Sequence, residues 1–151
     1  MTSRGAVAVG LALYVVLVLA FYGVHQLAVQ DGSGLYPVWY SGGDLLLNAL
    51  KAVGPGFAAG WLRRERGLRT GVTVGVVGGL FEVAILVTLT GVPFAELSGR
   101  ITVAAVYTLL AAALANAVGG AAGEFLRDRR NASNPLMRPP AYRRRVGDQE
   151  G

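Results

Sequence analysis

The chain has 151 residues, of which 53% are hydrophobic and 15% are charged, and it carries a formal net charge of +5. Soluble domains carry about 25% charged residues, so the long uncharged stretches indicate a membrane protein. The sequence has no cysteine and one histidine, His25, which excludes a disulfide framework, a cysteine nucleophile and a multi-histidine metal site within one chain. We therefore expect no metal or cofactor.

Four segments are long and apolar enough to span a membrane, since a span needs roughly 20 apolar residues. In chain order they cover about residues 5–29, 44–62, 70–93 and 101–126. Their β-branched residues would favour strands in water, but open strand edges are not tolerated in lipid. The sequence therefore predicts an all-α, polytopic membrane protein, with four transmembrane helices in a compact bundle over residues 1–126.

A cleaved signal peptide is the alternative for the first segment, GAVAVGLALYVVLVLAFYGVHQLAV, because Arg4 precedes it. Its apolar run is longer than that of a typical signal peptide, and no convincing small-residue cleavage site follows it. We expect a retained helix.

The basic residues orient the spans. Of the 14 Lys and Arg residues, all except Lys51 and Arg100 precede the first segment, separate the second from the third, or follow the fourth. The positive-inside rule then places both termini in the cytoplasm of a multi-pass protein of the cell membrane. Residues 127–151 are basic, polar and proline-containing, and we predict a largely disordered cytoplasmic tail there.

The second and fourth segments end alike, in GFAAGWLRRER from Gly56 and in GGAAGEFLRDRR from Gly119. Both contain Gly-x-Ala-Ala-Gly, then apolar residues, then charges. The match suggests two tandem helical hairpins of the same orientation, related by an axis along the membrane normal. The alternative is convergence, because glycine–alanine runs and terminal arginines are common in membrane helices.

Small residues recur at a spacing of four, which places them on single helix faces. Such faces let two backbones approach closely and are held by van der Waals contact. The expected packing positions are Gly56, Gly60, Gly71, Gly75, Gly79, Gly119 and Gly123.

Polar side chains interrupt three of the apolar segments at similar depth. Counted from the cytoplasmic arginines at about 1.5 Å per residue, Lys51 lies about 18 Å deep, Glu82 about 20 Å and Asn116 about 16 Å. Asn48 lies one turn further out on the Lys51 face. A single charge at the bilayer centre costs roughly 2.5 to 3.5 kcal/mol on insertion scales, so we expect Lys51 and Glu82 to pair within one polar layer that includes Asn116.

This layer has two competing interpretations. Intramembrane ionisable residues are candidates for an ion or proton pathway. Alternatively, Lys51 and Glu82 form a static buried bridge that fixes the register of two helices. A third option is that one of the two pairs with a charge on a partner protein.

The order of GxxAGWLRRERG, a glycine-rich span, a short loop and a span ending in GGxxGxxxRxR resembles a diffuse group of small, glycine-rich, prokaryotic four-span integral membrane proteins of unknown function. Residues 56–67, 71–79 and 119–129 carry the resemblance. Because the group has no assigned activity, the resemblance implies a four-span fold and no catalytic residues.

No Ser-His-Asp set, phosphate-binding loop or pair of carboxylates in one pocket is evident, so we expect no enzyme. The leading hypothesis is a structural or partner-assembly protein of the lipid bilayer, packing as a homo-oligomer or within a larger membrane complex. The alternative is a small transporter or channel that uses the polar layer for ion or proton-coupled passage. We expect no nucleic-acid partner, because the arginines flank apolar spans.

Overall fold

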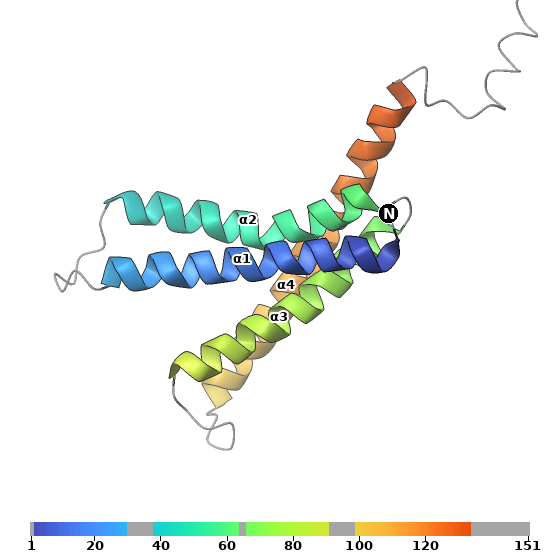
Figure 1. The fold of residues 1–151 in the computed structure, drawn as a ribbon. Helices are drawn as coiled ribbons and strands as arrows, with labels where there is room; N and C mark the ends of the chain where they lie inside the picture. The colour runs from blue at the N-terminus through green and yellow to red at the C-terminus, as the bar shows by residue number, and fades with distance from the viewer. Residues whose placement is uncertain (1, 30–37, 64–65, 91–98, 134–151) are drawn as a thin grey trace, which may run out of the picture.

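A computed structural model describes residues 2–29, 38–63, 66–90 and 99–133. This part of the chain forms four helices and no strand: α1 (Ser3–Val29), α2 (Val38–Leu62), α3 (Gly67–Thr90) and α4 (Gly99–Ser133) (Figure 1). All four helices are long and apolar enough to cross a membrane. The predicted all-α fold with four helices packed together is confirmed.

The helices are longer than the apolar segments at several ends. α2 begins at Val38 rather than near residue 44, and α4 continues to Ser133 rather than ending near residue 126. Hydropathy detects only the part of a helix that lipid would cover, whereas backbone hydrogen bonding continues into polar sequence. The beginning of the predicted tail is therefore helical, and residues 134–151 lie outside the described residues.

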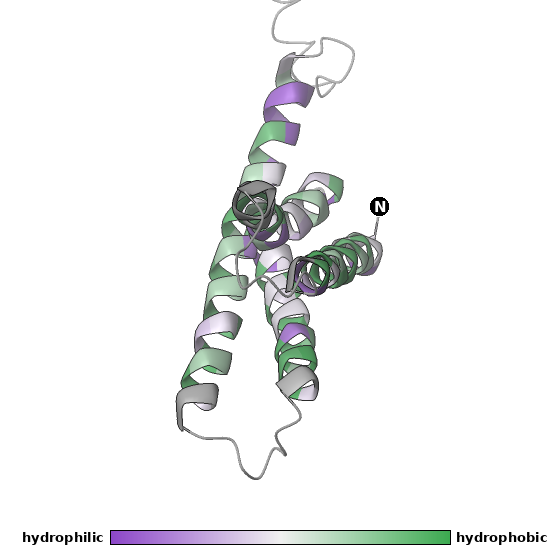
Figure 2. Cartoon of the chain, turned by 90° about the vertical axis from the view of Figure 1, so that its left-hand side faces the viewer, coloured by the Kyte–Doolittle hydropathy of each residue, from purple (hydrophilic) through white to green (hydrophobic). Residues whose placement is uncertain are grey.

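The helices are arranged as two hairpins. α1 lies beside α2, and α3 lies beside α4 (Figure 1). The hairpins meet at the end of the molecule where α1 begins, α2 ends and α3 begins; we call this the arginine-rich end, because Arg4, Arg63 and Arg69 lie there. Away from it the two hairpins diverge, as both Figure 1 and Figure 2 show.

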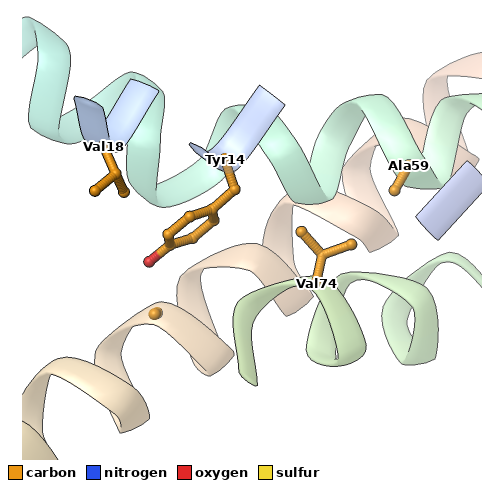
Figure 3. Packing of buried hydrophobic residues seen from close by; sticks show 5 residues of the cluster. Tyr14, Val18, Ala59 and Val74 are labelled. Carbon is orange, nitrogen blue, oxygen red and sulfur yellow. The ribbon is translucent and has the colours of Figure 1, made fainter. Parts of the chain in front are cut away.

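The buried core is small and is built from all four helices. Tyr14 and Val18 of α1 pack with Ala59 of α2, Val74 of α3 and Ala112 of α4 (Figure 3). Many large apolar side chains point outward instead, and Figure 2 shows hydrophobic colour along all four helices. Helices that are apolar on all sides are typical of membrane spans, where lipid covers the outer faces.

The glycines of α2 bring its backbone against that of α4. A Cβ at Gly56 would overlap the backbone of Asn116, and a Cβ at Gly60 would overlap that of Gly120. Only glycine permits this separation, because any side chain would push the helices apart. Close backbone approach through small residues is a common way for membrane helices to associate.

The glycines of α4 make the reciprocal contacts on α2. A Cβ at Gly119 would overlap the Val53 carbonyl, and one at Gly123 would overlap the Phe57 carbonyl. Val53 precedes Gly56 by the same interval as Asn116 precedes Gly119. The two similar sequence motifs therefore face each other across a local pseudo-twofold arrangement, as an axis parallel to the helices would produce.

The glycines of α3 contact two different helices. A Cβ at Gly71 or Gly75 would overlap the α4 backbone, whereas one at Gly79 would lie 3.1 Å from Leu109 Cδ1, a flexible side-chain end. Gly78, which the spacing-of-four pattern omits, lies against the Tyr14 ring. A Cβ at Gly78 would lie 2.6 Å from Tyr14 Cγ. Contact with α1 therefore requires a second glycine face on the same helix.

Candidate functional site

Lys51 of α2 and Glu82 of α3 form a buried ion pair. Lys51 Nζ donates to Glu82 Oε1 over 2.5 Å, and the two side chains are only 12% and 8% exposed. The ammonium also lies 4.6 Å from the centroid of the Phe21 ring. The ring supplies a favourable cation–π contact to an ammonium that is largely shielded from water.

The second oxygen of Glu82 is held by Tyr14 of α1. The Tyr14 hydroxyl donates to Glu82 Oε2 over 2.9 Å, and the tyrosine is 1% exposed. Figure 3 shows the hydroxyl pointing away from α1, into the space between the helices. Both carboxylate oxygens therefore have a donor, and the Lys51–Glu82–Tyr14 cluster joins α1, α2 and α3.

Tyr14 is a site residue that the sequence interpretation missed. The signal was available, because counting from Arg4 at about 1.5 Å per residue places Tyr14 about 15 Å deep, close to Lys51 and Glu82. A tyrosine inside an apolar segment is easily taken for a packing residue. A buried phenol usually finds a hydrogen-bond partner, so its depth relative to Glu82 was informative.

Asn116 lies in a separate contact, nearer the arginine-rich end, because its backbone faces Gly71, eleven residues before Glu82 on α3. It is fully buried; its Oδ1 accepts from the Gly56 N–H over 2.8 Å, and its Nδ2 donates to the Ala112 carbonyl over 3.0 Å. The structure thus brings Lys51 and Glu82 together but assigns Asn116 to the α2–α4 contact. Asn48 is half-buried on α2, one turn from Lys51.

Asn116 binds α2 directly after the proline of that helix. Pro55 lies inside α2 and is buried. A proline in a helix interior lacks an N–H and pushes the carbonyl four residues earlier away, which bends the helix; Figure 1 shows α2 bending near its middle. Asn116 supplies a strong acceptor to the next N–H along the chain, that of Gly56.

A second set of polar contacts lies at the arginine-rich end. Glu124 Oε2 of α4 accepts from the N–H of Gly67, the first residue of α3, over 2.6 Å. Thr70 accepts from Arg63 Nη1 over 2.5 Å and donates to the Arg66 carbonyl over 3.0 Å. A carboxylate at a helix N-terminus satisfies a backbone donor and complements the helix dipole. These contacts hold the start of α3, beside Arg66, which takes a φ of 65°.

An open groove lies between α1 and α3, where the hairpins diverge. It has a volume of about 480 Å³ and is lined by Leu19, Tyr22, Gly23, Gln26, Ala84, Ile85 and Thr88. Neither Lys51 nor Glu82 lines it. Within the described ranges, no three His, Asp or Glu side chains gather as a metal site would need. The cluster can hold charge and fix helix positions, and it offers no activated nucleophile.

No protein-family model matches the sequence, and neither a curated protein nor a solved structure shows significant similarity to it.

Proposed function

We propose that the chain is a non-enzymatic integral membrane protein with a structural role, which assembles with further copies of itself or within a larger membrane complex. The four long apolar helices support its placement in a lipid bilayer. The distribution of arginines supports a cell-membrane topology with both termini in the cytoplasm.

The observation that carries this proposal is that both oxygens of the buried Glu82 carboxylate are bound within the protein. Glu82 receives one donor on each oxygen, from Lys51 and Tyr14, and neither charged residue borders the groove between α1 and α3. A transport site needs ionisable groups that meet water or substrate. A cluster that joins α1, α2 and α3 instead specifies which helices are neighbours, a role attested for some buried polar groups.

The outer face of α4 offers a surface on which another copy or a partner can assemble. Its large apolar side chains lie at helical spacing along one face, and each is more than half exposed: Val103, Val106, Tyr107, Leu110, Leu114 and Val118. α2 and α3 occupy the other side of α4. In a bilayer this face contacts lipid, and a further helix can pack there without disturbing the bundle.

Particle mass and ion flux together test the proposal. The protein is extracted in a mild detergent. The protein mass of the particle, without its bound detergent, is then compared with the 15.7 kDa of one chain. We expect a particle of more than one chain, and proteoliposomes that pass protons and K⁺ no faster than protein-free vesicles. A single-chain particle whose ion flux disappears in the Lys51→Met variant would contradict the structural role.

A small transporter is the second candidate, and one observation favours it. Tyr22 lines the groove between α1 and α3 and also packs against the core that contains Tyr14. Tyr14 in turn binds Glu82. A proton could therefore pass from the groove to the carboxylate if the two tyrosines moved. Proton uptake by proteoliposomes that is lost in both Glu82→Gln and Tyr14→Phe would support this candidate.

A further inference from the structure

A groove at the arginine-rich end combines two cationic side chains with an apolar floor. It lies between the start of α1 and the end of α2, has a volume of about 370 Å³, and is lined by Arg4, Val7, Ala8, Leu11 and Arg63. None of these described lining residues is acidic. The two guanidinium groups come from segments far apart in the chain, so their proximity is a property of the fold.

A hydrogen bond to Thr70 holds the Arg63 side chain in place. Its Nη1 donates to Thr70 Oγ1, and Thr70 is 1% exposed. The Thr70 hydroxyl uses its only proton on the Arg66 carbonyl, so it can only accept from Arg63. A guanidinium has five N–H donors, and this contact uses one of them. The remaining donors of a positioned arginine suit a planar or tetrahedral oxyanion.

The apolar residues extend from the charges toward the interior of the span. Val7, Ala8 and Leu11 follow Arg4 along α1, and Leu11 lies about 10 Å further along the helix axis at about 1.5 Å per residue. Arginines at the ends of membrane helices lie at the level of lipid headgroups. The groove therefore presents positive charge at headgroup level and an apolar surface at the level of the first acyl carbons.

We propose that this groove binds one anionic phospholipid. Arg4 and Arg63 hold the phosphate through charge-assisted hydrogen bonds, and an acyl chain lies over Val7, Ala8 and Leu11. The phosphate chemistry is shared with free inorganic phosphate, but only a lipid uses the apolar floor. The site lies apart from the Lys51–Glu82–Tyr14 cluster and does not depend on the structural role proposed above.

Lipid binding is measured by native mass spectrometry and by thermal unfolding of the delipidated protein in detergent. The additives are phosphatidylglycerol, phosphatidylcholine and inorganic phosphate. We expect one tightly retained phosphatidylglycerol and a higher Tm with that lipid than with either other additive. Equal effects of the two lipids, or full stabilisation by inorganic phosphate alone, would overturn the proposal.

Two kinds of variant test the charged and apolar halves separately. Arg4→Gln and Arg63→Gln should each weaken phosphatidylglycerol binding about tenfold, as expected for loss of one charge-assisted contact. Arg130→Gln, an exposed arginine outside the groove, is the matched control and should bind normally. Equal weakening in Arg130→Gln would show that binding follows overall charge, which contradicts a specific site.

Ala8→Trp fills the groove without removing charge or disturbing the core, because Ala8 is exposed. It should lose the retained lipid, whereas Ala20→Trp, at an exposed alanine of α1 outside the groove, should keep it. This pair remains informative if Arg63→Gln fails to fold through loss of its Thr70 contact. Unchanged lipid retention in Ala8→Trp would place the lipid elsewhere and overturn the proposal.

Discussion

Gly56 and Asn116 are joined twice, once by a hydrogen bond and once by direct backbone contact. The Gly56 N–H donates to Asn116 Oδ1 over 2.8 Å, and a Cβ at Gly56 would overlap the Asn116 backbone. The hydrogen bond lies next to Pro55, where α2 bends. The bend in one helix is therefore matched to an amide on another, which links local sequence in α2 to the position of α4.

We expect Asn116→Ala to lower the free energy of unfolding by about 1 to 2 kcal/mol, because a buried N–H beside a proline loses its acceptor. Asn131→Ala makes the same chemical change at an exposed position of α4 and should have little effect. Denaturant titration in mixed micelles measures both variants. Similar stabilities for the two would mean that the Gly56–Asn116 hydrogen bond contributes little.

The glycine contacts predict a graded series of alanine substitutions. Gly75→Ala places a methyl group into the Ala112 backbone and should destabilise the protein by about 1 to 3 kcal/mol through overpacking. Gly79→Ala meets its nearest atoms at 3.1 Å or more and should cost less. Gly23→Ala, with nothing within 4 Å, should be neutral or slightly stabilising, because alanine favours a helix more than glycine does. Thermal unfolding of the three variants checks the order, and equal Tm values would contradict the close α3–α4 approach.

Tyr14→Phe keeps the ring and removes the hydroxyl that binds Glu82. Hydrogen bonds between membrane helices contribute about 0.6 kcal/mol on average and up to about 1.7. We expect a loss toward the upper value, because the acceptor is a buried carboxylate. Tyr107→Phe, on an exposed residue, is the matched control. A Tyr14→Phe protein as stable as the control would show that the hydroxyl does not support the ion pair.

The Lys51–Glu82 contact illustrates what a sequence can say about a membrane site. Helix rise is fixed, so residue counting alone places both side chains at similar depth. The high energy of a single charge in lipid then favours pairing. Residue counting gives Asn116 a similar depth, but Asn116 lies against Gly71, eleven residues before Glu82 on α3, and binds Gly56 of α2. Counting ignores how the helices cross, and it does not determine which helices are neighbours.

Other features depend on three-dimensional packing that hydropathy does not encode. The spacing rule identifies Gly71 and Gly75, but Gly78 lies on a different face that contacts Tyr14. Glu124 looks like an ordinary interfacial acid in the sequence, yet it binds the first N–H of α3. Such roles depend on the crossing of helices far apart in the chain. The apolar lengths alone were enough to predict the four helices.

The proposed orientation predicts opposite results for two reporter fusions. A reporter that works only outside the cytoplasm should be active when it is fused after residue 35, between α1 and α2. A reporter fused after residue 65, between α2 and α3, should show the cytoplasmic result, because four arginines surround that position. A cytoplasmic signal from the first fusion would reverse the topology and contradict the positive-inside assignment.

Lys51 and Glu82 should stabilise each other, and a double-mutant cycle measures that mutual stabilisation. Lys51→Met alone leaves an unpaired carboxylate, and Glu82→Gln alone leaves an unpaired ammonium. Removing one partner of a buried pair typically costs about 3 to 5 kcal/mol, and a change of protonation reduces that loss.

The measurement is the free energy of unfolding of the two single variants and of the double variant in the same detergent. We expect the loss of unfolding free energy in the double variant to be smaller than the sum of the two single losses, because neither charge remains buried. If the loss in the double variant equals the sum of the two single losses, Lys51 and Glu82 do not stabilise each other, and the account of the cluster is contradicted.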